Sequence, residues 1–358
     1  MSASAAVRAT VPRPRPAAIP EDEWGRAVAM VQGAQRILVC AHHKPDGDTI
    51  GSLLGLGHSL AQAGKEVTLT CADTPDATLA TLPGAEGILT RIPATADGRD
   101  RWDLVVTVDV SSLDRLGALY EDQRMLFEAL PILNIDHHAT NPHFGAANLV
   151  DPQAASATEV VTLLLQRLGI PLTVPVATCL LAGMMTDTLS FQTESTTGQT
   201  LRVAATLVEA GAPLAPLAVQ LFRQRSVGNA LIWKQALGTL QFAAGGRIAW
   251  VEVTPEMFEA AGAGADSAGL SNFALSVAGV EVGMAIEQER DGNVYVSLRS
   301  PTVDVAAVAA RFGGGGHQRA AGCQFPPAAG VAGARAQLLP ILEDALTPRP
   351  PLPPGAGE

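Results

Sequence analysis

The chain has 358 residues, more than the ~250–300 residues at which a single hydrophobic core stops growing, so we expect two domains. Apolar residues make up 47% of the sequence and charged residues 16%, which excludes a largely disordered chain. The formal net charge of −11 argues against a protein that grips long nucleic acid with a basic face, so we expect partners that carry few phosphates.

The cysteines and the chain ends bear on where the protein works. The cysteines lie inside or beside apolar runs without CxxC spacing, which predicts buried, reduced thiols and a cytoplasmic location; they are Cys40, Cys71, Cys179 and Cys323. No uninterrupted apolar run reaches the ~18 residues that a membrane helix requires, so we expect no membrane segment. Residues 1–18 predict a disordered leader and residues 347–358 a disordered, Pro-rich tail.

The N-terminal part of the chain alternates strand-like and helix-like segments. Continuous apolar runs predict buried strands at residues 37–40, 67–71, 104–108 and 132–135. Helical spacing of apolar residues predicts helices at residues 21–35, 50–60, 156–168 and 174–185. Because strands alternate with helices, we expect an α/β fold with a doubly wound parallel sheet.

The C-terminal part changes character twice. A helical connector is predicted at residues 196–210, 214–222 and 229–242. A second, smaller α/β domain follows, with strands at residues 247–253, 280–287 and 294–298 and helices at residues 267–275 and 304–311. The boundaries that we expect are 19–195 for the first domain, 196–243 for the connector and 244–346 for the second domain.

The loop AHHKPDGDTIGS, from Ala41 to Ser52, lies between the first predicted strand and a predicted helix. It places His42, Asp46 and Asp48 at the carboxyl end of a strand, where open α/β sheets bind ligands. Two carboxylates and an imidazole gather hard metal ligands in one turn. The Pro-Asp-Gly within it is also ordinary turn chemistry, so this loop alone leaves both interpretations open.

Three more acidic or histidine groups follow apolar runs: Asp109, Asp136-His137-His138 and Asp187. Each alone could be a helix cap or a core residue with local hydrogen bonds. Together, carboxylates that converge at one sheet edge would repel one another unless cations neutralised them. Mixed carboxylate and imidazole ligands suit Mn²⁺ and also accept Mg²⁺, Co²⁺ or Fe²⁺, whereas the absence of paired cysteines argues against structural zinc.

A glycine run, Gly313 to Gly316, precedes His317 in the second predicted domain. Glycines expose backbone N–H groups and let a ligand approach closely, as in loops that hold phosphate. Arg299 and Ser300, at the end of a predicted strand, would add a bidentate cation and a hydroxyl group. A glycine run can equally be a flexible linker, but the small residues that resume directly after His317 favour phosphate binding.

These segments match a known family. In order, HHKPDGDTIGS, LVVTVD, NIDHH and MTDTLSF resemble the four motifs of the DHH phosphoesterases, and SLRS and FGGGGHQRAAG resemble the associated C-terminal DHHA1 domain. The resemblance covers about residues 37–326 and depends on both the order and the spacing of the motifs. Within the family, the chain is most similar to the stand-alone branch of nanoRNases and 3′-phosphoadenosine-5′-phosphate (pAp) phosphatases.

The resemblance implies two sets of Mn²⁺ ligands that share a bridging aspartate. One set is His42, Asp46 and Asp109, and the other is Asp48, Asp109, His137 and Asp187. His138 would lie beside the scissile phosphate, and Asp136 would orient the histidines. The family's substrate-binding residues in the second domain, which would hold a terminal phosphate or base, correspond to Arg299, Gly314, Gly315, Gly316 and His317.

Two positions depart from the commonest family pattern. Leu189 stands in the fourth motif where a glycine is frequent, which puts the local loop shape in question. The first motif contains an extra histidine, His43, to which we assign no role.

The expected activity is two-metal hydrolysis of phosphate esters in short oligoribonucleotides and pAp. Other activities stay open: hydrolysis of cyclic dinucleotides, processive digestion of single strands, hydrolysis of pyrophosphate or polyphosphate, or nucleotide binding without catalysis. The acidic balance disfavours a long nucleic-acid channel. The sequence leaves open the preferred substrate, the cleavage polarity and whether the protein forms a homodimer.

Overall fold

The structure is a computed structural model that describes residues 19–224, 226–262 and 267–346. The predicted leader and tail lie outside the described residues. The chain forms two compact units that divide after Gln224, inside the predicted helical connector.

The first unit is built on a parallel sheet with strand order β2-β1-β3-β4-β5. Its strands are β1 Arg36–Ala41, β2 Glu66–Cys71, β3 Leu104–Val108, β4 Ile132–Asp136 and β5 Ala147–Val150. The predicted doubly wound sheet is therefore confirmed. The sequence prediction missed β5, a four-residue strand that begins just beyond a turn in which the Asn148 side chain bonds both the N–H and the carbonyl of Gly145.

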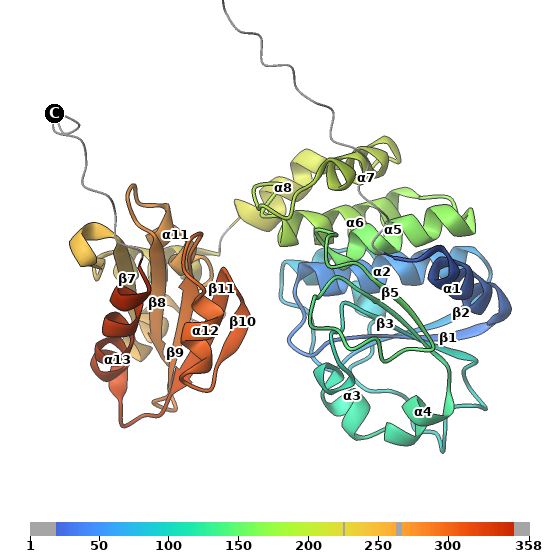
Figure 1. Cartoon of the computed structure of the whole chain (residues 1–358), viewed down its shortest axis with the longest axis horizontal. Helices are drawn as coiled ribbons and strands as arrows, with labels where there is room; N and C mark the ends of the chain where they lie inside the picture. Colours follow the sequence, from blue (N-terminus) through green and yellow to red (C-terminus); the bar gives the residue numbers. More distant parts are fainter. Residues whose placement is uncertain (1–18, 225, 263–266, 347–358) are drawn as a thin grey trace, which may run out of the picture. The chain divides into compact units, whose positions relative to one another are not determined.

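Helices cover both faces of this sheet (Figure 1). One face packs against α1 Glu21–Gly33, α2 Gly47–Gln62, α5 Ala157–Leu168 and α6 Val174–Asp187, with α7 Gly198–Glu209 and α8 Leu214–Phe222 packed against the same cluster. The other face packs against the short α3 Ala118–Glu121 and α4 Arg124–Ala129. Along β1, Leu38 and Cys40 enter the second cluster while Ile37 and Val39 enter the first. This two-sided burial explains why the strands are continuous apolar runs.

A stripe of glycines brings α2 and α6 into close contact. A Cβ atom at Gly47 would lie 2.3 Å from Thr186 Oγ1, and one at Gly51 would lie 2.6 Å from the carbonyl oxygen of Cys179. Gly183 of α6 has the same property, because its Cβ would lie 3.0 Å from the carbonyl oxygen of Gly47. The first turn of α2 is thereby held against the last turn of α6.

The second unit contains a six-stranded sheet with strand order β10-β11-β9-β8-β7-β6. Only β7 and β8 are parallel; every other pair is antiparallel. The strands are β6 Gln241–Ala243, β7 Ile248–Val253, β8 Val282–Gln288, β9 Val294–Arg299, β10 Gly315–His317 and β11 Ala320–Phe325. The predicted second α/β domain is confirmed.

Helices also pack on both faces of the second sheet. One face is covered by α12 Val305–Ala310 and α13 Gly330–Ala345, and the other by α9 Val227–Leu237, α10 Pro255–Ala261 and α11 Leu270–Ser276. The helix predicted at residues 229–242 is wrong in its C-terminal part. It ends at Leu237, where the Thr239 hydroxyl donates to the Ala236 carbonyl at 2.7 Å and accepts from the N–H of Glu252 at 2.7 Å in the turn that leads into β6.

The glycine run was expected to be a loop, but Gly315–His317 is an edge strand that pairs with β11. Glycine and alanine have low intrinsic strand preference, so the pairing is imposed by the rest of the sheet.

Among the described residues, no single helix is long and apolar enough to cross a membrane. The bent pair formed by α7 and α8 has the length and composition of a membrane span, and this similarity is weak evidence.

Replacing Gly51 by Ala tests the close helix contact. The added methyl group would overlap the Cys179 carbonyl and the Gly183 backbone, so we expect the free energy of unfolding to fall by about 1–3 kcal/mol. Gly25→Ala is the matched control, because a Cβ atom at Gly25 in α1 has no neighbour within 4 Å and should stabilise its helix slightly. Chemical unfolding of both variants gives the comparison, and equal stability would contradict the close contact.

Candidate metal centre

The site lies where the strand order of the first sheet reverses. β1 lies next to both β2 and β3, so the connections after β1 and β3 leave toward opposite faces and open a crevice at their carboxyl ends. His42 follows β1 directly and Asp109 follows β3 directly, while Asp136 ends β4. The topology therefore gathers three of the predicted site residues at one sheet edge.

Helix N-termini fix the two aspartates of the first motif. Asp46 is the N-cap of α2 and accepts a hydrogen bond from the N–H of Thr49 at 3.0 Å. Asp48 is fully buried and accepts hydrogen bonds from the N–H groups of Ala157 at 2.6 Å and Thr158 at 2.9 Å, at the start of α5. The helix dipoles favour negative charge at these positions.

The first cluster of donor atoms contains His42, Asp46 and Asp109. The Nδ1 atom of His42 lies 2.7 Å from the carbonyl oxygen of His43, which assigns the proton to Nδ1 and leaves a lone pair on Nε2. That Nε2 lies 3.3 Å from Asp109 Oδ2. The cluster thus presents one imidazole nitrogen and carboxylate oxygens within reach of a single ion.

The second cluster contains Asp48, His137 and Asp187. His137 Nε2 lies 3.3 Å from Asp187 Oδ2 and 3.8 Å from Asp48 Oδ2. The same nitrogen lies 3.7 Å from Asp109 Oδ1, the oxygen that faces away from the first cluster. Asp109 therefore contacts both clusters, one with each carboxylate oxygen.

The backbone and the carboxylate of Asp109 both point to a special role. Its φ is +57°, in the left-handed region that aspartate tolerates better than most residues. Its Oδ1 is buried and has no hydrogen-bond partner among the described residues. A buried carboxylate oxygen without a partner is costly, and a divalent cation would satisfy it.

The raised pKa values of the clustered aspartates indicate that a positive charge would stabilise the site. Burial and the neighbouring carboxylates of Asp109 and Asp46 raise the pKa of Asp48 to about 7. Burial is also the main cause that raises the pKa of Asp109, and burial with the carboxylates of Asp48 and Asp46 raises that of Asp187 well above its usual value. Asp187 ends α6, where the helix dipole disfavours negative charge. The donor set fits divalent cations with mixed nitrogen and oxygen ligation.

Asp136 hydrogen-bonds the ring of His138 and the backbone of His137. Its Oδ1 accepts hydrogen bonds from His138 Nδ1 at 2.7 Å and from the backbone N–H of His137 at 2.8 Å. Although burial alone lowers the pKa of His138, the bond to Asp136 and the nearby carboxylates raise it to about 9. In the metal-free protein this pKa favours the positively charged form of His138 at neutral pH.

Sequence reasoning missed Asn141. Its amide donates to Asp136 Oδ2 at 2.6 Å and to the carbonyl of Val110 at 3.1 Å, so it ties Asp136 to the backbone that follows Asp109. The sequence signal was an asparagine directly before a proline, shortly after the paired histidines, which looks like ordinary turn chemistry.

The structure also describes Leu189 and His43, the two positions that depart from the commonest family pattern. Leu189 has φ +47° and begins three consecutive left-handed residues, through Phe191. The loop thus adopts a glycine-like conformation despite the leucine, at about 1–2 kcal/mol for a residue with a Cβ. His43 bonds the Arg115 carbonyl through its backbone N–H and places its Nδ1 2.8 Å from the same oxygen, so it anchors the loop and joins neither cluster.

In the second unit, the predicted substrate-binding residues fall on adjacent strands. Arg299 ends β9 opposite Ala320 of β11, and Ala320 pairs in turn with His317 of β10. Arg299 donates to the Leu298 carbonyl at 2.9 Å and has no ion-pair partner among the described residues. Burial lowers its pKa.

Ser300 does not present a free hydroxyl group. It is buried, donates to the Glu281 carbonyl at 2.6 Å and accepts from the N–H of Val303 at 2.9 Å. Gly313 and Gly314 line a pocket of about 490 Å³ on the sheet, together with Tyr295, Ser297 and other residues. A Cβ atom at Gly314 would lie 2.2 Å from the Gly322 carbonyl oxygen, so close strand packing requires this glycine.

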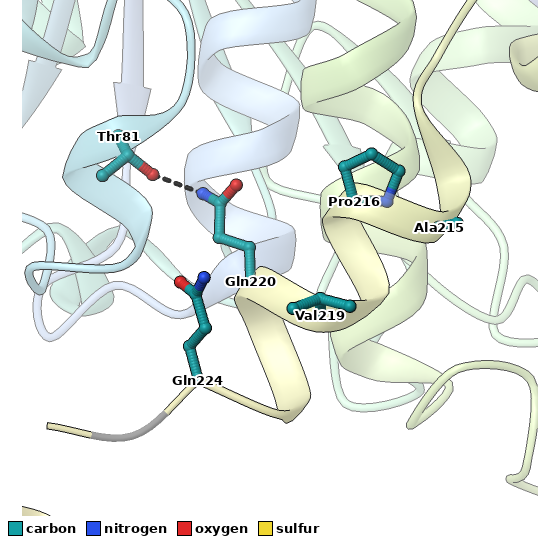
Figure 2. A pocket seen from close by; sticks show the side chains of 6 residues that line it. All are labelled: Thr81, Ala215, Pro216, Val219, Gln220 and Gln224. Carbon is teal, nitrogen blue, oxygen red and sulfur yellow. Dashed lines mark hydrogen bonds between the residues drawn. The ribbon is translucent and has the colours of Figure 1, made fainter.

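A second pocket, of about 650 Å³, lies along α8 of the first unit (Figure 2). Its lining residues are Thr81, Ala215, Pro216, Val219, Gln220 and Gln224. The Gln220 amide donates to the Thr81 hydroxyl across it. The pocket contains no ionisable side chain and none of the predicted site residues, so we do not assign it to the chemistry.

Two family models match the chain: the N-terminal domain of the DHH family over residues 36–184, and the DHHA1 domain over residues 251–346. The bifunctional oligoribonuclease and PAP phosphatase NrnA of Thermus thermophilus is 36% identical over 288 residues, which are 80% of this chain and 83% of that protein. The NrnA protein of Bacillus subtilis is 26% identical over 296 residues, 81% of this chain and 89% of that protein.

Two further similarities concern a different activity and the fold. The cyclic-di-AMP phosphodiesterase GdpP of Geobacillus thermodenitrificans is 29% identical over 322 residues, 83% of this chain but 45% of that protein. The crystal structure of an exopolyphosphatase-related protein from Bacteroides fragilis has a TM-score of 0.82 and 24% identity, covering 92% of this chain and 98% of that chain. This last similarity shows a shared fold.

The raised carboxyl pKa values predict how the metal-free protein responds to pH. The folded state keeps protons on Asp48, Asp109 and Asp187 at pH values where the unfolded chain has released them, so its stability falls as the pH rises. The loss of charge on His138 acts in the same direction as the pH approaches its pKa of about 9. We expect the melting temperature of the chelator-treated protein to be higher at about pH 5.5 than at about pH 8, with a difference of a few kcal/mol in stability.

Thermal melting with and without Mn²⁺ measures this effect. Added Mn²⁺ should raise the melting temperature more at the higher pH, because the ion competes with protons for the same carboxylates. A metal-free melting temperature that increases with pH over this range would contradict the electrostatic account.

Proposed function

The chain belongs to the DHH family of metal-dependent phosphoesterases, and we propose that it hydrolyses short oligoribonucleotides and pAp to mononucleotides with two Mn²⁺ ions. The observation that carries this proposal is the carboxylate of Asp109, which contacts one donor cluster with each of its oxygens. The substrates are those that the names of the NrnA relatives state. The buried free thiols of all four cysteines are compatible with activity in the cytoplasm.

The proposed ligand assignment follows the two clusters. His42, Asp46 and Asp109 would hold one ion, and Asp48, Asp109, His137 and Asp187 the other. A bound pair of divalent cations lowers the pKa of a water molecule and stabilises charge on the phosphoryl oxygens. The protein's part is to hold these ligands rigidly, through the N-termini of α2 and α5 and the end of α6.

His138 is proposed to stabilise the phosphoryl group. Its raised pKa favours the positively charged ring, and Asp136, itself held by Asn141, holds that ring in place. A preorganised cation beside developing negative charge stabilises a transition state more than the ground state. Asp136 and Asn141 act through His138 and are positioning residues.

The second unit is proposed to bind a phosphate group of the substrate. Arg299 has no ion-pair partner among the described residues, and a guanidinium group in such a position is suited to a phosphate. Backbone N–H groups of the glycine run would assist. The space beside Gly315 is open, because a Cβ atom there meets nothing within 4 Å, whereas one at Gly316 would lie 2.6 Å from the Ala320 carbonyl oxygen. Ser300 is left out of this proposal because its hydroxyl is already bonded in its own loop.

Hydrolysis of cyclic dinucleotides is the second candidate function. The similarity to GdpP over 83% of this chain supports it. The same donor clusters would serve either substrate, so the two candidates differ in what the second unit binds.

Turnover of a substrate panel tests the proposal. We expect Mn²⁺-dependent release of phosphate from pAp and of mononucleotides from 5′-phosphorylated dinucleotides to hexanucleotides, with lower kcat/KM for cyclic di-AMP. Asp109→Asn keeps the shape of the side chain and removes its charge, so it should reduce kcat by at least about 10²–10³-fold on every substrate. Faster turnover of cyclic di-AMP would favour the second candidate, and an active Asp109→Asn variant would end the bridging assignment.

Arg299→Gln tests the substrate-binding role of the second unit. We expect the KM for pAp to rise by about 10-fold or more, because a charge-assisted hydrogen bond to the substrate contributes roughly 1.5–3 kcal/mol. The affinity of the protein for Mn²⁺ should stay unchanged. Arg290→Gln is the matched control, since Arg290 is an exposed arginine of the same unit. Equal KM values for the two variants would refute the role of Arg299.

A further inference from the structure

Thr49, which was not among the residues predicted for the site, lies at the centre of the first donor cluster. Its side chain is fully buried in the first turn of α2. The hydroxyl oxygen lies 2.5 Å from His42 Nε2, 2.6 Å from Asp109 Oδ2 and 3.0 Å from Asp46 Oδ1. A single hydroxyl group therefore contacts all members of the first cluster.

The hydroxyl group of Thr49 has more hydrogen-bond acceptors around it than hydrogen atoms to satisfy them. The Nδ1–H of His42 faces the His43 carbonyl, so Nε2 is an acceptor, and both carboxylate oxygens are acceptors when ionised. Thr49 supplies one hydroxyl hydrogen for these three acceptors, of which Asp46 Oδ1 also accepts from the Thr49 N–H. Of the two buried acceptors, His42 Nε2 and Asp109 Oδ2, at least one is left without a hydrogen and needs a proton or a cation, because burial excludes bulk water.

The position of the hydroxyl group is rigid. The backbone N–H of Thr49 bonds Asp46 Oδ1, which fixes the residue relative to the N-cap. The preceding and following glycines of α2 pack directly on α6, so the first turn of the helix has no room to shift. A β-branched side chain has few rotamers in a helix, so the hydroxyl group is preset.

The hydroxyl group also bears on the orientation of Asp109. By donating to Oδ2, it favours the carboxylate rotation in which Oδ1 faces the second cluster, 3.7 Å from His137 Nε2. This rotation presents one oxygen to each cluster. The only other close neighbour printed for Oδ2 among the described residues is His42 Nε2 at 3.3 Å, and Oδ1 has no hydrogen-bond partner there.

We propose that Thr49 is a positioning residue that holds His42, Asp46 and Asp109 at ligand spacing and so sets the affinity of the first cluster for its divalent cation. The inference rests on the proposed function, because it assumes that the cluster binds a metal. Residues that hydrogen-bond metal ligands commonly change metal affinity by 10–100-fold.

Mn²⁺ binding followed by electron paramagnetic resonance of the free ion tests this inference without an activity measurement. The wild-type protein should bind two ions per chain. Thr49→Ala and Thr49→Val, which remove the hydroxyl group, should weaken binding of at least one ion by about 10–100-fold. Thr49→Ser keeps the hydroxyl group and should restore the affinity to within about 3-fold of the wild type, a loss of less than ~0.7 kcal/mol.

Thr162→Val is the matched control. Thr162 is another fully buried helical threonine, but its hydroxyl donates to the Thr158 carbonyl of its own helix. We expect it to bind Mn²⁺ like the wild type. Thermal melting without metal checks the fold of each variant, and Thr49→Ala carries the comparison if the added methyl group of Thr49→Val prevents folding.

The outcomes separate this inference from the proposed function. Unchanged Mn²⁺ affinity in Thr49→Ala overturns the role of Thr49 while leaving the metal centre intact. Equal weakening in Thr162→Val also overturns it, because the effect would then be general to buried threonines. A wild-type protein that binds no Mn²⁺ would overturn the proposed function itself.

Discussion

The fold brings three carboxylates to one sheet edge around His137, those of Asp48, Asp109 and Asp187. Of these, Asp48 and Asp109 are almost entirely buried. Their raised pKa values express the cost of holding negative charges together away from water. Divalent cations remove this cost, because each ion supplies the positive charge that the buried oxygens lack. The arrangement of the first unit can be understood as the support that this cluster of charges requires.

The support comes from three contacts between elements that are distant in the sequence. Parallel strands bring His42 and Asp109 to adjacent strand ends. The N-terminus of α5 holds Asp48 through two backbone N–H groups, and the glycine contact between α2 and α6 brings Asp187 to the same place. Each contact uses backbone atoms, which are less free to move than side chains, so the ligands are positioned before any ion binds.

The sequence predicted the strands that end at the site because β1, β3 and β4 are apolar runs that stop at polar residues. It did not predict Thr49 or Asn141, because a threonine in a helix and an asparagine before a proline are common without a ligand nearby. It assigned a ligand role to Ser300, whose hydroxyl the tertiary structure uses in a loop. It also missed β10 and β11, whose small residues pair only because neighbouring strands are present. Side-chain partners across the fold therefore had to come from the structure.

Anomalous X-ray diffraction from crystals grown with Mn²⁺ tests the central claim most directly. The account predicts two anomalous peaks on opposite sides of the Asp109 carboxylate, one beside His42 and Asp46 and the other beside His137 and Asp187. A map without peaks at this carboxylate, from a protein whose other contacts are as described, would contradict the claim that cations neutralise the buried acidic cluster.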